Sequence, residues 1–300
     1  MLARLGLGGQ VALLGLVVWF AASVLGEHWH ELRMTRLTLV LRPGWLALSG
    51  VATLVTYAFL ISAWRGIVLG WGEHIAWSQA VRVWTLSNLG RYLPGKVWSV
   101  AGLAVLAQRA GVSGWAAVGA AVAIQSLVVG TGVAVVVAAA PAAASPLWLA
   151  SAAVVAAATM AALGAPPVVR VLNRLVPSAG LRPLGGAAAA RAALAILVSW
   201  VGYGLAFWCL ARGLLGASAL PLAAATGAFA AGNVIGLIAL FAPGGLVVRE
   251  GVLVALLTPA LGPGPALALS VGSRILLTLT ELVAGAVGLS VRSPDRAGRG

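Results

Sequence analysis

Long runs of apolar residues, separated by short polar or turn-forming segments, dominate the pattern of this chain. A helix needs about 20 apolar residues to cross a bilayer, and runs of this length or longer recur throughout. They lie at 9–26, 44–64, 76–108, 114–140, 145–164, 187–214, 220–257 and 265–291. The first run could be a signal peptide, since Arg4 precedes it, but the many runs behind it favour a retained helix.

Helix-breaking residues interrupt two of these runs. Pro94-Gly95 lies within the third run, and Pro243-Gly244-Gly245 lies within the seventh. Proline lacks an amide donor and clashes with the preceding turn, and glycine loosens the backbone, so each helix should break there. Broken backbone at membrane depth must be satisfied by protein or by a watery cavity. The pattern therefore predicts two re-entrant hairpins of half-length helices among about six transmembrane helices.

The distribution of arginines supports this topology. With two hairpins, all the strongly basic loops fall on one side of the membrane and the uncharged loops fall on the other. The basic segments are the loops 109–113 and 165–186 and the tail 292–300. The uncharged loops are 141–144, 215–219 and 258–264. Both termini should then be cytoplasmic, while the segment 27–42, which is near charge balance, should lie along the outer interface.

The two interrupted segments look like copies of one unit. Asn88 precedes the first break and Asn233 the second, and a polar residue follows each proline by 31 positions, Gln125 in one copy and Arg274 in the other. Three full spans separate the hairpins, so the hairpins should enter from opposite faces. Inverted repeats with interrupted helices are typical of transporters, whose binding sites lie near the bilayer midplane. We expect one membrane domain, 1–300, with repeats over about 76–140 and 220–291.

Composition excludes a soluble fold and several classes of function. Charged residues make up 8% of the chain and hydrophobic residues 61%, whereas soluble domains are roughly one-quarter charged. The net charge of +13 is scattered between apolar runs, which indicates topology and attraction to anionic lipid rather than nucleic-acid binding. The single cysteine, Cys209, excludes a disulfide framework. We find no nucleophile–base pair, phosphate loop or metal-ligand cluster, so we expect no enzyme, cofactor or metal site.

Charged residues inside the apolar runs are the main candidates for function, because a charge in the bilayer costs several kcal/mol. Lys96, the only lysine, begins the helix after the first break, where free amides and the helix dipole favour an anion. Lys96 and Arg91 could contact a lipid phosphate or could instead reach for headgroups at the surface. Arg249 in the corresponding second helix could hold a phosphate bidentately. Glu250 points about 100° away from it, so we do not expect these two neighbours to pair.

Four polar residues form one stripe along the last helix. Ser270, Arg274, Thr278 and Glu281 follow one another at helical spacing. We expect Arg274 and Glu281 each to meet a partner on another helix, with Glu250 as the partner of Arg274. Glu250 and Glu281 are candidate coupling or counter-ion groups, and a static buried ion pair is the alternative.

Three amide side chains complete the candidate cavity lining. They are Asn88, Gln125 and Asn233. For Asn88 and Asn233 we favour hydrogen bonds between helices, and Gly232-x-x-x-Gly236 predicts close helix packing beside Asn233.

Two stretches carry a resemblance to a known family. The first is NLGRYLPGKVW at 88–98, continuing to QRAG at 108–111, and the second is APGGLVVREG at 242–251, followed by Ser273-Arg274. Over roughly 80–290 the chain resembles the lysylphosphatidylglycerol synthase transmembrane-region family, a flippase-like domain. Relatives often carry Glu-Arg where this chain has Gln125-Ser126. Full-length synthases add a soluble aminoacyltransferase domain, so for this chain the resemblance implies lipid movement without lipid aminoacylation.

We therefore expect a flippase-like transporter in the bacterial inner membrane. Its substrate would be a phosphate-bearing lipid: a phospholipid, an aminoacyl-phospholipid or a polyprenyl-phosphate-linked lipid. Lys96, Arg91, Arg249 and Arg274 would hold the phosphate. One alternative is a non-transporting membrane partner of a glycosyltransferase or lipid-modifying enzyme, and another is a small-solute or ion transporter. The glycine-rich helices would allow a homodimer.

Overall fold

Helices account for the regular secondary structure in the part of the chain that the structure describes. The computed structural model describes residues 40–92, 97–139, 146–175, 183–216, 220–238 and 248–291. Across those ranges the chain forms helices and contains no strand. The all-α prediction is therefore confirmed for the described part, while the predicted span at 9–26 and the tail 292–300 lie outside it.

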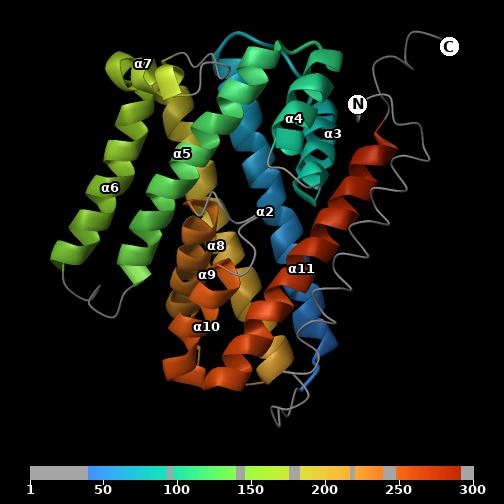
Figure 1. Ribbon diagram of the computed structural model, residues 1–300, viewed down its shortest axis with the longest axis vertical. Coiled ribbons are helices and arrows are strands. Elements are labelled where there is room, and N and C mark those ends of the chain that lie inside the picture. The colour runs from blue at the N-terminus through green and yellow to red at the C-terminus, as the bar shows by residue number, and fades with distance from the viewer. Residues whose placement is uncertain are drawn as a thin grey trace.

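Four helices are long and apolar enough to cross a membrane. They are α2 (Pro43–Gly70), α5 (Gly114–Ala139), α8 (Gly186–Leu215) and α11 (Pro263–Ser290). With 26 to 30 residues each, they extend about 40 Å at 1.5 Å per residue, enough for a bilayer core with some tilt. This confirms a multi-pass membrane protein. The 19-residue α6 (Pro146–Gly164) lies beside α5 and is followed by a short helix, α7 (Pro166–Leu175), at one end of the molecule (Figure 1).

Two pairs of half-length helices complete the fold. Helix α3 (Trp77–Asn88) continues into the 3₁₀ turn η2 (Leu89–Tyr92) and packs against α4 (Val97–Arg109). In the second pair, α9 (Leu222–Ile238) packs against α10 (Val248–Leu261). These helices have 12 to 17 residues, fewer than a span requires. Figure 1 shows the first pair at the end that carries α7, whereas α10 extends to the opposite end.

The described helices flank both predicted breaks. The turn η2 ends at Tyr92 and α4 begins at Val97, while α9 ends at Ile238 and α10 begins at Val248. The breaking residues themselves, Pro94, Gly95, Pro243, Gly244 and Gly245, lie outside the described residues, as does Lys96.

Two predicted loops are largely helical instead. Residues 166–175, within the loop expected at 165–186, form α7, whose Val169 is buried while Arg170 is exposed. A helix of this length with arginines is too short and polar to register as an apolar run. The loop expected at 258–264 shrinks to Gly262, whose φ of 82° ends α10 just before Pro263 begins α11.

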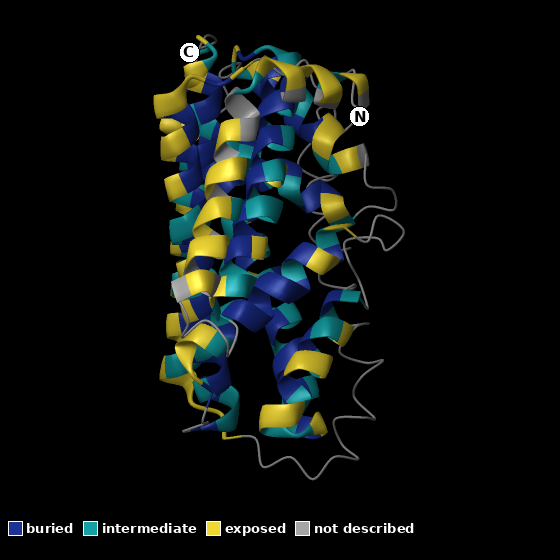
Figure 2. Ribbon diagram, turned by 90° about the vertical axis from the view of Figure 1, so that its left-hand side faces the viewer, coloured by how far each residue is buried: buried dark blue, intermediate teal, exposed yellow. Residues whose placement is uncertain are grey.

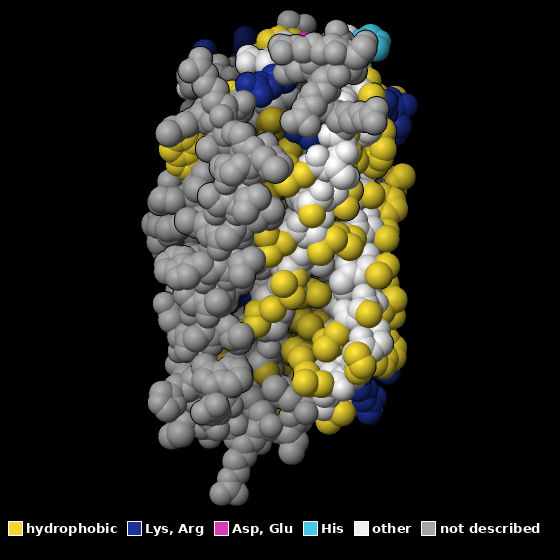
Figure 3. Space-filling view, turned by 90° about the vertical axis from the view of Figure 1, so that its right-hand side faces the viewer, with side chains coloured by type: hydrophobic (Ala, Val, Ile, Leu, Met, Phe, Trp, Pro, Cys, Tyr) yellow, Lys and Arg dark blue, Asp and Glu magenta, His cyan; other side chains and the backbone are white. Residues whose placement is uncertain are grey.

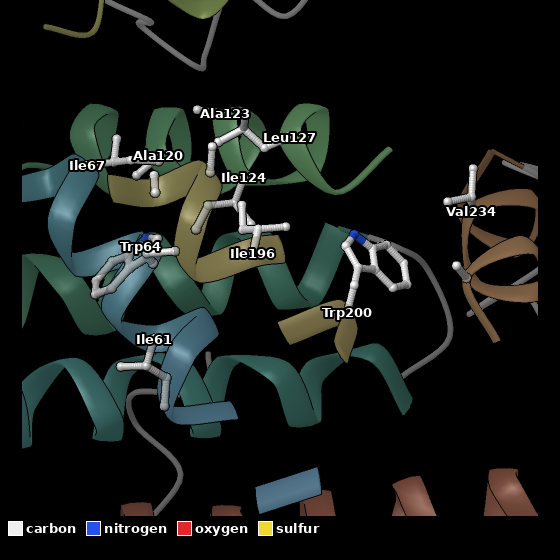
Figure 4. Packing of buried hydrophobic residues seen from close by; sticks show 14 of the residues in the cluster. Ile61, Trp64, Ile67, Ala120, Ala123, Ile124, Leu127, Ile196, Trp200 and Val234 are labelled. Carbon is white, nitrogen blue, oxygen red and sulfur yellow. The ribbon is translucent and has the colours of Figure 1, made fainter. Parts of the chain in front are cut away.

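The core lies between the long helices. Figure 2 shows buried residues concentrated on the inward sides of the helices and exposed residues on the outward sides. In Figure 4, Trp64 of α2, Ile124 of α5 and Ile196 of α8 meet in this core. The Trp64 indole donates to the Ala117 carbonyl at 3.3 Å, and the Trp200 indole donates to the Thr131 hydroxyl at 3.0 Å. Polar atoms in the apolar interior thus find partners on neighbouring helices.

The outer surface of the bundle is apolar between two charged ends. Large hydrophobic side chains are exposed along the spans, including Val55, Leu194, Val201 and Val283. On the face in Figure 3, hydrophobic side chains cover much of the visible described surface between arginines at both ends. The described arginines at the α7 end are Arg65, Arg82, Arg109, Arg170, Arg174 and Arg191. Those at the opposite end are Arg42 and Arg212. An exposed apolar belt of this kind suits a lipid environment.

Candidate functional site

The first turn of α10 carries two charged residues into the interior of the bundle. Arg249 is only 4% exposed, and Glu250 beside it is largely buried. Glu250 Oε1 lies 3.7 Å from Arg249 Nη1 and 3.5 Å from Arg274 Nε on α11. We call these three residues the arginine cluster. With all three groups ionised, two positive charges and one negative charge leave it with a net charge of +1.

The pairing within this cluster confirms one prediction and corrects another. Arg274 and Glu250 form the expected ion pair between helices. The expectation that Arg249 and Glu250 do not pair is wrong, because their atoms reach ion-pair distance. The 100° between neighbouring side chains separates their Cβ directions, but the long arginine side chain bends back far enough to bridge that angle.

Arg249 has partners outside the cluster, but several buried polar atoms of the cluster have no hydrogen bond to another described residue. Arg249 Nη2 donates to Ser273 Oγ at 3.2 Å, and the Arg249 guanidinium lies 5.1 Å from the centre of the Phe229 ring. Ser270 Oγ donates to the backbone carbonyl of Glu250 at 3.2 Å. Among the described residues, however, no hydrogen bond reaches either carboxylate oxygen of Glu250, or Nε and Nη1 of Arg249. Buried charged groups are costly without such partners, so this is a place where a polar ligand gains energy.

A second polar group joins the first helix pair to α11. Arg91 Nη1 of η2 lies 2.7 Å from Glu281 Oε1, and the Tyr92 hydroxyl donates to Glu281 Oε2 at 2.6 Å. The Tyr92 oxygen is also 3.4 Å from Thr278 Oγ1. Glu281 thus meets the partner on another element that the polar stripe predicted. Both of its oxygens are engaged, in contrast to those of Glu250.

Asn88 supports Arg91 rather than linking two helices. Its Oδ1 accepts from Arg91 Nη2 at 2.6 Å, and its Nδ2 donates to the Trp84 carbonyl at 3.0 Å. Both bonds remain within α3 and η2, so the interhelical role expected for Asn88 is not what these contacts provide. The amide instead fixes the arginine that pairs with Glu281.

A recess opens beside this second group. It is bordered by α2, α3, η2, α8 and α11. Its lining consists of Tyr57, Leu60, Trp84, Thr85, Asn88, Arg91, Tyr203, Glu281 and Ala284. Two aromatic rings connect the recess to the arginine cluster. Tyr203 stacks on Phe229 with 5.1 Å between the ring centres, and the Arg249 guanidinium lies over the Phe229 ring.

Two other predicted residues, Gln125 and Asn233, are not among the residues that line the recess. Gln125 is exposed on α5 and does not line the recess, so its place in a cavity stays a prediction. Asn233 is half-buried on α9. A Cβ added to Gly232 would lie 3.3 Å from the Arg249 backbone oxygen and 3.2 Å from Leu253 Cγ. The close helix packing predicted there is confirmed, and it fixes the start of α10 against α9.

The sequence analysis missed the aromatic part of the site. Its four aromatic residues lie in apolar runs, where large rings usually serve packing. They are Tyr57, Trp84, Tyr203 and Phe229. One signal could have found the hydroxyl-bearing members: the chain has three tyrosines, and all three contribute here, Tyr92 through its bond to Glu281.

The described residues contain no group of three or more His, Cys, Asp or Glu side chains that could hold a metal ion. No family model matches the chain, and no curated protein or solved structure is significantly similar to it.

Proposed function

We propose that this protein is a flippase-like transporter that moves a phosphate-bearing lipid across the bacterial inner membrane. The observation that carries the proposal is the arginine cluster, which buries two guanidinium groups against one carboxylate inside an apolar bundle. Charges buried among membrane helices are expensive, and their presence favours a functional role.

The chemistry of this cluster suits a phosphodiester. A phosphodiester carries one negative charge, which matches the net charge of +1 left by the arginine cluster. Guanidinium groups bind phosphate through charge-assisted, often bidentate hydrogen bonds. Arg249 lies in the first turn of α10, where the free amides and dipole of the helix also favour an anion.

The helix arrangement supports a transport path for the headgroup. In this proposal α3–α4 and α9–α10 are re-entrant hairpins of an inverted repeat, entering from opposite sides and bringing their broken ends toward the midplane. The end that carries α7 faces the cytoplasm, because most of the described arginines lie there. The resemblance to the lysylphosphatidylglycerol synthase transmembrane-region family agrees with this topology and with a lipid substrate.

The acyl chains would stay in the bilayer while the phosphate moves through the bundle. A lipid phosphate would compete with the Glu250 carboxylate for Arg249 and Arg274, since that carboxylate has no hydrogen bond to another described residue. Rocking of one repeat against the other would then expose the occupied cluster to each leaflet in turn.

A reconstitution experiment tests this proposal. Proteoliposomes containing the purified chain should move a fluorescent phosphatidylglycerol between leaflets, measured by dithionite quenching of the outer leaflet. Arg249→Ala and Arg274→Ala should each abolish this movement while retaining the elution profile of the folded protein. Arg170→Ala, which removes an exposed arginine from α7, is the matched control and should transport normally. Unchanged transport in both cluster variants would refute the proposed phosphate site.

A further inference from the structure

We infer that the recess beside Arg91 and Glu281 binds an uncharged, hydroxyl-rich headgroup, such as glycerol, inositol or a sugar. The inference builds on the proposed function by naming the class of lipid that the phosphate site accepts. It depends on where the recess lies, on its charge balance and on the chemistry of its walls.

The recess lies where a headgroup would extend from a phosphate bound at the arginine cluster. Tyr203 lines the recess and stacks on Phe229 at 5.1 Å, and Arg249 lies over the other ring of that pair at 5.1 Å from its centre. The Phe229 and Tyr203 rings therefore lie between the Arg249 guanidinium and the recess. In this inference the phosphate stays at the arginine cluster and its headgroup extends beside the ring pair into the recess.

The charge balance of the recess disfavours charged headgroups. Its two ionised groups, Arg91 and Glu281, form a direct pair at 2.7 Å, and Tyr92 donates to the second carboxylate oxygen. An ammonium headgroup would have to displace Arg91 to reach the carboxylate. A second anionic group would have to displace Glu281 to reach the guanidinium. A neutral headgroup requires neither exchange.

The walls of the recess combine aromatic faces with hydrogen-bond donors. Tyr57, Trp84 and Tyr203 present rings of the kind that pack against the C–H faces of a polyol. Asn88 Nδ2 uses one hydrogen on the Trp84 carbonyl and retains a second. Within the described residues, no hydrogen bond uses the Tyr203 hydroxyl. These groups match the alternating donors and acceptors of neighbouring hydroxyls.

This recess should therefore discriminate against headgroups that lack hydroxyls. A site built to hydrogen-bond hydroxyls rejects an analogue without them, because its own polar groups then stay unpaired. Among lipids with identical acyl chains, phosphatidylglycerol and phosphatidylinositol should bind more tightly than phosphatidylethanolamine or phosphatidic acid.

Native mass spectrometry of the full chain, with these four lipids in competition, tests the inference. We expect at least fivefold preferential retention of the two polyol lipids, and comparing them separates a glycerol from a ring polyol. Tyr203→Phe keeps the ring but removes its hydroxyl, and should lower that preference about threefold. Thr258→Val is the matched control, since its hydroxyl bonds within α10 to the Val254 carbonyl, and it should retain the preference.

The outcomes separate this inference from the proposed function. Equal retention of all four lipids, a preference for phosphatidylethanolamine, or an unchanged preference in Tyr203→Phe would overturn the polyol assignment. Transport of every phosphate-bearing lipid at one rate alongside such a result would leave the proposed function intact. Selective retention of polyol lipids without movement between leaflets would support the headgroup site and contradict transport instead.

Discussion

Replacement of Glu250 by glutamine should destabilise the protein while strengthening its affinity for anionic lipid. The carboxylate lies 3.5 Å from Arg274 Nε and 3.7 Å from Arg249 Nη1. At an effective dielectric constant of about 20, each contact is worth about 4 to 5 kcal/mol. Glutamine removes both attractions and leaves two arginines without a counter-ion, although it also removes the cost of burying the carboxylate. We therefore expect a net loss of about 3 to 5 kcal/mol in the free energy of unfolding.

The loss can be measured by unfolding the protein with SDS in micelles of a neutral detergent. Glu73→Gln removes a carboxylate near the α7 end of the molecule and should cost about 1 kcal/mol or less. A phosphate-bearing lipid should restore much of the stability of Glu250→Gln, because it supplies the missing negative charge. At 100 times its Kd such a ligand contributes about 2.7 kcal/mol. The double variant Glu250→Gln/Arg274→Gln should also be more stable than Glu250→Gln alone.

Two results would refute this reasoning. If Glu250→Gln unfolds at the same SDS concentration as the wild type, the carboxylate does not hold the two guanidinium groups together. If the lipid stabilises wild type and variant equally, the phosphate does not take the place of the carboxylate.

Three further predictions concern packing, helix ends and the second ion pair. Gly132→Ala should lower the free energy of unfolding by about 1 to 3 kcal/mol, because the new Cβ would lie 2.5 Å from Val234 Cγ2. Gly251→Ala is the control, since its Cβ would have nothing within 4 Å, and it should be neutral or stabilising. Equal effects of the two substitutions would disprove the packing argument. Arg82→Ala removes the donors to the carbonyls of Gly288 and Val291 at the end of α11. Amide hydrogen exchange should therefore accelerate there, and the free energy of unfolding should fall by about 1 kcal/mol. Glu281→Gln should cost about 1 kcal/mol in SDS unfolding, because its partner Arg91 is 46% exposed, whereas the arginine partners of Glu250 are 5% and 16% exposed. A loss as large as that of Glu250→Gln would show that the exposure of the arginine does not weaken the pair.

Part of the candidate site could be predicted from the spacing of polar residues in the sequence. The polar stripe on α11 led to the Arg274–Glu250 pair and to an interhelical partner for Glu281, because helical spacing sets which residues share a face. The same reasoning failed for Arg249 beside Glu250, where side-chain length outweighed direction. It also placed Gln125 in the cavity from repeat spacing alone, and the structure leaves that residue exposed and outside the recess lining.

Local physics determined the elements of this protein, and tertiary packing determined its site. The length of an apolar run acts within a few residues, so the spanning helices could be predicted from neighbouring positions. The missing amide of a proline acts just as locally, but the breaks predicted at Pro94 and Pro243 lie outside the described residues. The recess brings Tyr57 of α2, Tyr203 of α8 and Glu281 of α11 together from three distant segments. Which rings and charges meet depends on the rotation and tilt of whole helices against one another. These are set by contacts such as that at Gly232, and no periodicity along one helix encodes them.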